Sequence, residues 1–226
     1  MSFQRIVIYG GNGFVGSHIA KDLSEHELCV LCLSRTGHKP AHLRCQKWSE
    51  RVKWCQGDAA EPNIKLLSSA DALVCAIGSA PVPTFSKEAY EQQVFANGVT
   101  NANAIKAAGE AGITRVVLIS AIIPSWMNRD SFGYAKGKQM SEQAARDFSN
   151  LSDHHSAVIL RPGMIYGTRY TANCKPIKLG TVFGPLGSLI PSQFISVDRV
   201  ASRATNALIE PESYSNSVTI LTGRDI

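Results

Sequence analysis

The sequence lacks the segments that would carry the chain into or across a membrane. It has no apolar run of about 18 residues or more, and no charged amino-terminal segment followed by an apolar signal region. It also has no basic run interleaved with aromatic residues, and its net charge of +5 is modest and spread along the chain. We therefore expect a soluble, cytoplasmic protein with no integral membrane segment and no nucleic-acid partner.

The sequence also lacks a complete set of metal ligands. Among its six cysteines, Cys29 and Cys32 have the spacing of a redox or metal pair, but no second pair and no histidine cluster completes a site. Both lie in the apolar run 28–33, where a spacing of three residues on a strand directs them to opposite faces. We expect no bound metal and reduced, mostly buried thiols.

Length and composition fit one domain spanning residues 1–226, with 44% hydrophobic and 18% charged residues. Short apolar runs typical of buried strands alternate with segments of helical periodicity. Expected strands cover residues 6–9, 28–33, 52–56, 72–77, 115–121, 156–160 and 217–221. Expected helices cover residues 14–26, 87–111, 132–150 and 194–208. The alternation predicts an α/β fold, a doubly wound parallel sheet that binds ligands at the carboxyl ends of its strands.

The first expected strand runs into a glycine-rich turn, RIVIYGGNGFVG, that opens a helix. Gly10 permits the tight turn, Gly13 leaves space for a phosphate, and Gly16 lets the helix pack closely on the strand. The helix N-terminus then offers free N–H groups to the pyrophosphate of a dinucleotide. The candidate contacts here are Gly10, Asn12, Gly13, Phe14, Val15 and Gly16. The alternative is a glycine-rich turn that binds nothing.

The end of the second strand bears on the choice of cofactor. A site that prefers NAD would have an acidic residue there, whereas this chain has Ser34 and Arg35. Arginine can pair with a 2′-phosphate, so we expect NADP(H), with NAD(H) less favoured. A solvated surface arginine is the alternative. Asp58 follows the third strand and could accept a hydrogen bond from adenine. The end of the fourth strand could line the cofactor through Ala76, Ile77 and Gly78.

A second constellation consists of Ser120, Tyr134 and Lys138. Tyr134 and Lys138 are four residues apart on an expected helix and share one face, and Ser120 ends the neighbouring strand. Positive charge from Lys138 and from an oxidised nicotinamide would favour the phenolate of Tyr134, which could then act as a base. Ser120 would bind the substrate oxygen, and Lys138 would also hold the nicotinamide ribose. The alternative is an ordinary surface tyrosine and lysine.

Together these motifs resemble the short-chain dehydrogenase/reductase family, and the chain is similar to its extended or atypical members. The resemblance rests on GGNGFVG, the SR pair, the GD pair, the ISA strand end, YAKGK and RPGMIYG. A third strand containing Trp54 adds a similarity to the branch that includes the 39 kDa accessory subunit of respiratory complex I and a fungal oxidoreductase-like protein of coenzyme Q biosynthesis. The resemblance implies a Rossmann-type NAD(P)-binding domain with a Ser-Tyr-Lys centre.

The resemblance extends the set of candidate cofactor contacts. It implies that the side chain of Asn97 supports the cofactor side of the cleft, although a helix-surface amide is the alternative. The full set then also contains Ala59, Asn97, Tyr134, Lys138 and Pro162.

The substrate region departs from the extended members, which usually carry a larger C-terminal domain. Only about 60 residues follow Arg161, so we expect a small substrate cap from about residue 162, with residues 168–191 as a flap. Apolar loops after the fourth, fifth and sixth strands suit a small hydrophobic carbonyl, alcohol or quinone-like substrate, unless these side chains only pack the core.

Three functions remain open at this stage. The favoured one is an NADP(H)-dependent oxidoreductase acting on a hydrophobic small molecule as a monomer or homodimer. The second is a non-catalytic NAD(P)H-binding protein with a structural or regulatory role, as several members of the similar branch are thought to be. The third is an epimerase or dehydratase with a tightly held cofactor, which would consume no net NADPH.

Overall fold

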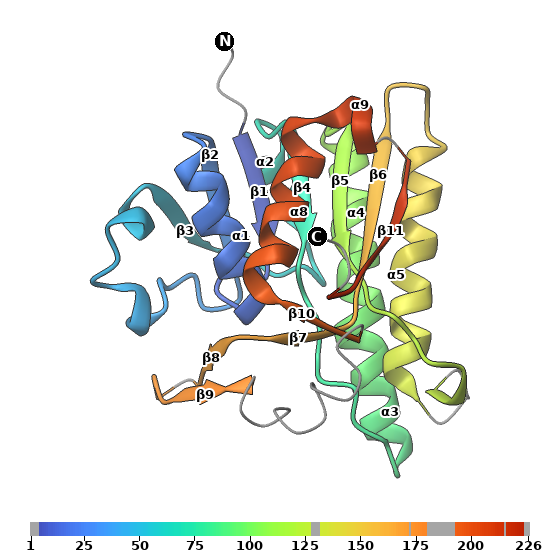
Figure 1. Ribbon diagram of the computed structural model, residues 1–226. Coiled ribbons are helices and arrows are strands. Elements are labelled where there is room, and N and C mark those ends of the chain that lie inside the picture. The colour runs from blue at the N-terminus through green and yellow to red at the C-terminus, as the bar shows by residue number, and fades with distance from the viewer. Residues whose placement is uncertain (1–4, 128–131, 172, 180–192, 215, 224–226) are drawn as a thin grey trace.

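The computed structural model describes residues 5–127, 132–171, 173–179, 193–214 and 216–223, and its centre is a seven-stranded sheet (Figure 1). Every pair of neighbouring strands in this sheet is parallel. In spatial order the strands are β11 (Val218–Leu221), β6 (Ser156–Pro162), β5 (Arg115–Ile119), β4 (Ala72–Cys75), β1 (Arg5–Tyr9), β2 (Cys29–Ser34) and β3 (Val52–Gln56). The chain order reverses between β1 and β4, where sheets of this kind bind ligands. The predicted doubly wound fold is confirmed.

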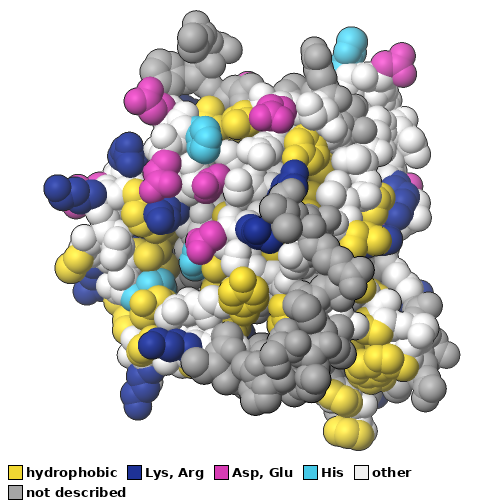
Figure 2. Space-filling view, viewed as in Figure 1, with side chains coloured by type: hydrophobic (Ala, Val, Ile, Leu, Met, Phe, Trp, Pro, Cys, Tyr) yellow, Lys and Arg dark blue, Asp and Glu magenta, His cyan; other side chains and the backbone are white. Residues whose placement is uncertain are grey.

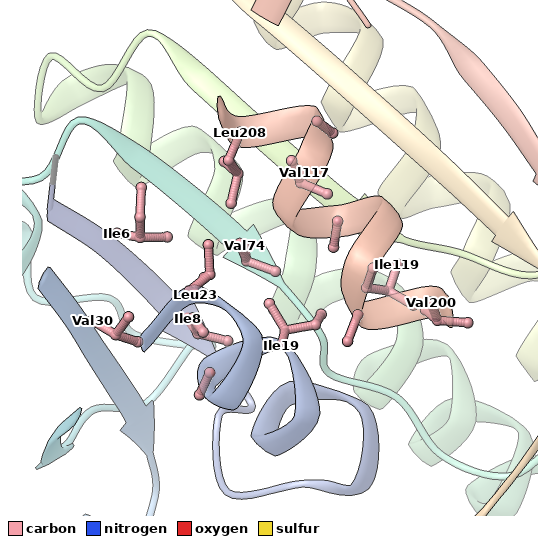
Figure 3. Close-up of a cluster of buried hydrophobic side chains, with 14 of the residues drawn as sticks. Ile6, Ile8, Ile19, Leu23, Val30, Val74, Val117, Ile119, Val200 and Leu208 are labelled. Atoms are coloured by element: carbon pink, nitrogen blue, oxygen red, sulfur yellow. The ribbon is translucent and has the colours of Figure 1, made fainter. Parts of the chain in front are cut away.

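Helices cover both faces of the sheet (Figure 1). Helices α1 (Phe14–Glu25) and α8 (Val197–Ile209) lie on one face. The other face carries α2 (Ile64–Leu67), α4 (Thr100–Glu110) and α5 (Gly133–Ser149), with α3 (Lys87–Val94) packed on α5. Alternate residues of β1 enter the two layers: Ile6 and Ile8 face α1 and α8 (Figure 3), and Val7 and Tyr9 face the other layer. Each such buried side chain stabilises the fold by about 1.5–3 kcal/mol.

The expected helix over residues 87–111 is one continuous helical segment with an irregular centre. Between α3 and α4 lies a π turn, η3 (Phe95–Val99), which adds a residue to the helical repeat. The turn contains Asn97, whose side chain is fully buried. Such turns commonly mark functional positions, and this one directs an amide toward the end of β4.

The C-terminal part forms two small additional sheets. Strand β7 (Met164–Tyr166) pairs with β10 (Phe194–Ser196), and β8 (Thr168–Tyr170) pairs with β9 (Pro176–Lys178). The expected helix over residues 194–208 is wrong at its start, because Ser196 caps α8 by accepting a hydrogen bond from the Arg199 amide. The remaining short elements are η1 (Ala41–Leu43), η2 (Lys47–Glu50), η4 (Ser125–Met127) and α9 (Pro211–Tyr214). Much of the predicted flap, residues 172 and 180–191, lies outside the described residues.

The six cysteines are all free thiols, but burial differs from the expectation. Cys32 faces the core and Cys29 is exposed, as their spacing on β2 predicts. Only Cys32 and Cys75 are buried, so the prediction of mostly buried thiols is wrong; Cys45, for example, lies in the irregular β2–β3 connection. Among the described residues, no helix is long and apolar enough to cross a membrane. The cytoplasmic location stays a prediction.

Candidate functional site

The turn between β1 and α1 lies at the switch point, and at Gly10 and Gly16 other parts of the backbone leave no room for a side chain. Gly10 has a φ of +82°, in the left-handed region, and a Cβ there would lie 2.8 Å from the carbonyl oxygen of Ala76. At Gly16 a Cβ would overlap the carbonyl oxygen of Gly10. Because Gly10 and Gly16 have no side chains, the end of β1 can lie against the end of β4 and against the start of α1.

The first turn of α1 is open to an anion. Its N-cap is the exposed Gly13, and none of the described side chains caps the helix or places an acidic group in its first turn. The amides of Phe14, Val15 and Gly16 have no partner within the helix, and they lie at its positive end. Asn12 stands half-buried in the turn before them. This donor set fits a pyrophosphate.

The ends of β2 and β3 form the next part of the site. The carbonyl oxygen of Ser34 accepts hydrogen bonds from the amides of Gly37 and Gly57, which ties the two strand ends together. Arg35 is exposed beside them. Asp58 is also exposed, and its Oδ1 accepts a bond from the Ala60 amide at 2.9 Å. The predicted contact Ala59 has its side chain in the core, at 4% exposure, so only its backbone remains for a cofactor.

The end of β4 meets Asn97 and Lys138. A Cβ at Gly78 would lie 3.0 Å from Asn97 Oδ1 and 3.4 Å from Lys138 Nζ. Asn97 also fixes the next residue, because its Oδ1 accepts from the Ser79 amide at 3.0 Å and its Nδ2 donates to the Ser79 hydroxyl at 2.7 Å. Half-buried Ala76 and Ile77 precede Gly78. The predicted grouping of this loop with Asn97 is therefore present, and the alternative of a surface amide is wrong.

Tyr134 and Lys138 lie together on the buried face of α5. Their exposed fractions are 9% and 4%, so the alternative of an ordinary surface pair is wrong. The ammonium group of Lys138 donates a hydrogen bond to the carbonyl oxygen of Ile119 at 2.9 Å and lies 5.9 Å from the centroid of the Tyr134 ring. The four-residue helical spacing and the end of β5 together position the pair.

Burial changes the titration of both groups. It raises the pKa of the Tyr134 hydroxyl to about 12. It lowers the pKa of Lys138 to about 8, although Glu142 and Cys75 oppose the shift. At neutral pH the phenol is therefore protonated and the ammonium group is mostly charged. In the protein alone, burial thus shifts Tyr134 away from its phenolate form. The expected role as a base also depended on an oxidised nicotinamide, and it stays a prediction.

Ser120 has a partner that the sequence analysis did not foresee. Its hydroxyl donates a 2.7 Å hydrogen bond to Oε1 of Glu142, and the residue is 3% exposed. A hydroxyl has one proton to donate, so in this geometry Ser120 has none left for a substrate oxygen. Glu142 lies eight residues beyond Tyr134, about 12 Å along the helix axis. The structure thus groups Tyr134 with Lys138 and directs the Ser120 hydroxyl elsewhere.

Sequence reasoning missed three residues that hold this site: Glu142, Arg161 and Gln93. Glu142 follows Lys138 by four residues and binds Arg161 as well as Ser120. Gln93 accepts from the Tyr134 amide at 3.0 Å and donates to the Val82 carbonyl oxygen at 2.8 Å. The helical spacing from Lys138 could have indicated Glu142, since an acid four residues after a lysine shares its face. No comparable signal marked Gln93.

The predicted substrate walls are partly exposed. Val82, Phe85 and Trp126 expose more than half of their surface, and Figure 2 shows apolar side chains at the end of the molecule where α3 begins. Ile122 and Tyr166 are less exposed. The last predicted contact, Pro162, is buried at the end of β6, and its carbonyl oxygen accepts from the Ile122 amide at 2.9 Å.

A separate cavity of about 230 Å³ lies on the outer side of α1. Its wall includes His18 of α1 and His42, whose ring stacks on Tyr170 at 4.0 Å. None of the predicted cofactor contacts lines it, so it is not the candidate cofactor cleft.

Comparison with known proteins identifies the family. The model of a family described as NAD(P)H-binding matches residues 10–211. The chain belongs to this NAD(P)H-binding family. The match includes the glycine turn, the Tyr134–Lys138 pair and α8, and of the seven sheet strands it spans β2 to β6.

A curated relative of this NAD(P)H-binding protein is an uncharacterized chloroplastic protein of Arabidopsis thaliana. The two are 34% identical over 194 residues, which is 84% of this chain and 60% of the plant protein. The chain thus spans less than two thirds of that relative.

Solved structures show the same fold at low sequence identity. An oxidoreductase of the short-chain dehydrogenase/reductase family from Burkholderia thailandensis has a TM-score of 0.76 at 15% identity, covering 99% of this chain and 92% of that one. Gre2 of Candida albicans, solved with NADPH, has a TM-score of 0.73 at 17% identity, covering 97% and 78%. A UDP-glucuronic acid 4-epimerase of Bacillus cereus, solved with NAD, has a TM-score of 0.74 at 17% identity, covering 98% and 78%. The NAD(P)H-binding protein is therefore similar to short-chain dehydrogenase/reductases, while the narrower branch stays a prediction.

Proposed function

We propose that this protein is an NADP(H)-dependent oxidoreductase that reduces a small hydrophobic carbonyl or quinone-like compound. The observation that carries the proposal is the buried pair Tyr134 and Lys138, placed at the switch point beside Gly78 and Asn97. A buried titratable pair beside a dinucleotide cradle is typical of a redox centre.

For each part of the cofactor, the protein offers a group that would bind it. The first-turn amides of α1 would hold the pyrophosphate, and Asp58 would hold the adenine amino group. Lys138 would hold the nicotinamide ribose through its ammonium group, and Gly78 leaves room for the ring beside it. When bound, the nicotinamide supplies a hydride to the substrate, or accepts one. Every other part of the reaction depends on the protein's own groups.

Tyr134 would supply the proton. Its raised pKa keeps the phenol protonated at neutral pH, so it is set to give a proton to the strongly basic oxygen that forms when a carbonyl is reduced. The charge of Lys138, close to the phenol ring, would then stabilise the phenolate that is left.

The preference for NADP(H) is supported by Arg35. It is exposed at the end of β2, where an acidic side chain would repel a 2′-phosphate and a guanidinium can bind it through two charge-assisted hydrogen bonds. The hydrophobic substrate class is supported by the exposed apolar side chains of Val82, Phe85 and Trp126.

Replacement of Tyr134 by Phe tests the proposal. The assay follows oxidation of NADPH with a panel of aromatic ketones, isoprenoid aldehydes and quinones, for the wild type and the variant. We expect the variant to bind NADPH with unchanged affinity, because the phenol oxygen is not needed for the pyrophosphate, but to lose at least 100-fold in kcat with a ketone, since proton transfer of this kind contributes about 10²–10⁴. Equal turnover by the two proteins would contradict the proposal.

A second candidate, a non-catalytic NAD(P)H-binding module, is favoured by one observation. The Ser120 hydroxyl is engaged by Glu142, so no third group is free to hold a substrate oxygen beside Tyr134 among the residues predicted for that role. The module would bind NADPH and support a partner without consuming it. Full rescue of a deletion phenotype by the Tyr134→Phe variant would support the module over the oxidoreductase.

A further inference from the structure

A buried polar network lies one helical turn beyond Lys138 on α5. Glu142 is 6% exposed, and its Oε1 accepts hydrogen bonds from the Ser120 hydroxyl and from Arg161 Nε, both at 2.7 Å. Its Oε2 pairs with Arg161 Nη2 at 2.5 Å and with Arg146 Nη2 at 3.4 Å. A carboxylate at this depth is stable only because these groups satisfy it.

The network is connected to Lys138 in two ways. Glu142 follows Lys138 by four residues on α5, so the two side chains share one face of the helix. The Lys138 ammonium group donates to the carbonyl oxygen of Ile119, and the next residue, Ser120, donates to Glu142. Two consecutive residues at the end of β5, Ile119 and Ser120, therefore bind the ammonium group and the carboxylate, respectively.

Several charged and titratable groups act on Lys138. Burial lowers the pKa of Lys138 to about 8, and of the two groups that raise it Glu142 has the larger effect and Cys75 of β4 the smaller. Tyr134 lies one turn before Lys138, and its phenol is neutral, so it adds no charge beside the ammonium group. For Glu142 itself, burial raises the pKa, but the hydrogen bonds and charge of Arg161, with the Ser120 bond and the charge of Arg146, bring it below its usual value. Glu142 is therefore the main charge that favours the ammonium form.

We propose that Glu142 is a positioning residue for Lys138, that it keeps the buried ammonium group charged, and that Arg161 limits how strongly its carboxylate does so. Arg161 pairs with both carboxylate oxygens and cancels part of their charge as seen from Lys138. The electrostatic relation stands without turnover, whereas its consequence for the reaction rests on the proposed function.

The two partners give opposite expectations, which a purely structural role does not. Removing the carboxylate in Glu142→Gln leaves Arg161 as an unpaired cation, so Lys138 should lose its proton at lower pH. Removing the cation in Arg161→Gln leaves Glu142 with its full charge, so Lys138 should keep its proton to higher pH. A clamp that only joins β6 to α5 would weaken in both variants without this reversal.

The experiment is an NMR titration of the full chain labelled with ¹³C-lysine, without cofactor or substrate. The Lys138 side-chain signal is assigned by its loss in Lys138→Met. We expect the midpoint to fall by about one pH unit in Glu142→Gln and to rise by about one in Arg161→Gln. Glu110→Gln, which removes an exposed carboxylate paired with Lys106, is the control and should leave the midpoint unchanged. Shifts of the same sign in both variants, or no shift, overturn the proposal.

Circular dichroism and the thermal midpoint check that each variant is folded. If Glu142→Gln does not fold, Arg161→Gln decides alone, because a rise supports the proposal and an unchanged or lower midpoint overturns it. Should turnover be found, the high-pH limb of kcat/KM should move with the Lys138 midpoint in each variant. If the midpoints move as expected but no variant or wild type turns over, the proposed function fails while this inference stands.

Discussion

At the residue scale, burial separates the titration of Lys138 and Tyr134 in opposite directions. The pKa of Lys138 falls from 10.5 to about 8, and that of Tyr134 rises from 10.0 to about 12. Between pH 8 and 10 the unfolded chain therefore binds more protons at Lys138 than the folded protein does, and stability from this group rises with pH. Above pH 10 the unfolded chain loses tyrosine protons that the fold retains, so Tyr134 lowers stability there.

The Lys138→Met variant tests this linkage. Relative to the variant, we expect the wild type to gain about 2 kcal/mol in free energy of unfolding between pH 8 and pH 9.5, because each unit of separation between the two pKa values corresponds to about 1.4 kcal/mol. Urea unfolding of both proteins at a series of pH values measures the difference. If the free energies of unfolding of the two proteins changed in parallel with pH, folding would not lower the pKa of Lys138, and the prediction would be wrong.

Single residues of the site could be predicted from the sequence where local helical spacing places them, but not where their contacts come from other elements. Tyr134 and Lys138 were found because a four-residue helical spacing fixes a shared face before any tertiary contact is known. The direction of the Ser120 hydroxyl could not be read in the same way, since its partner Glu142 comes from another element. The raised pKa of Tyr134 was not foreseen, because burial is a property of the packed molecule that residue spacing does not show.

At the element scale, Gln93 joins three segments. Its Oε1 accepts from the amide of Tyr134 in the first turn of α5, and its Nε2 donates to the carbonyl oxygens of Val82 and, at 3.3 Å, of Ala80. The helix start that carries Tyr134 and the loop after β4 are thus held by one amide on α3. A change in that loop can therefore reach the proposed proton donor through a single side chain.

Two substitutions of Gln93 separate these bonds. Gln93→Glu keeps the acceptor for Tyr134 but loses both donors, so we expect faster amide hydrogen exchange in residues 79–83 with exchange in the first turn of α5 unchanged. Gln93→Met loses all three bonds, so both segments should exchange faster, and the free energy of unfolding should fall by about 1–3 kcal/mol. Exposed Gln92→Met is the matched control. Identical exchange in the Glu and Met variants would show that Gln93 does not connect the segments.

Strands and helices were predicted well where their apolar residues form a clear run or repeat at a regular spacing. The strands of the central sheet begin within one residue of their expected positions because they are continuous apolar runs bounded by turns, but β6 extends through Pro162 and β4 ends early at Cys75. The π turn at Phe95–Val99 was not predicted, since one extra residue in a helix barely changes its hydrophobic period. The strand β10 was missed because its pairing with β7 is a contact between segments far apart in the chain.

At the scale of the whole molecule, the sheet order brings the proposed parts together. The glycine turn follows β1, Gly78 follows β4, and the Lys138 contact is the last residue of β5, so three adjacent strands end at one site (Figure 1). Two buried clusters, one on each face, hold these strands in register. The alternation of elements predicts parallel strands whose carboxyl ends lie at one edge of the sheet. The location of a site could therefore be predicted, whereas the substrate could not.

The most direct test of the central claim follows a label from cofactor to product. The wild type is incubated with the carbonyl and quinone panel and NADPH that carries deuterium on its hydride-donating carbon, and the products are analysed by mass spectrometry. We predict deuterium on the former carbonyl carbon of at least one ketone or aldehyde, with slower transfer from labelled NADH and almost none in Tyr134→Phe. Unlabelled products throughout, from a protein shown to bind NADPH, would contradict the account.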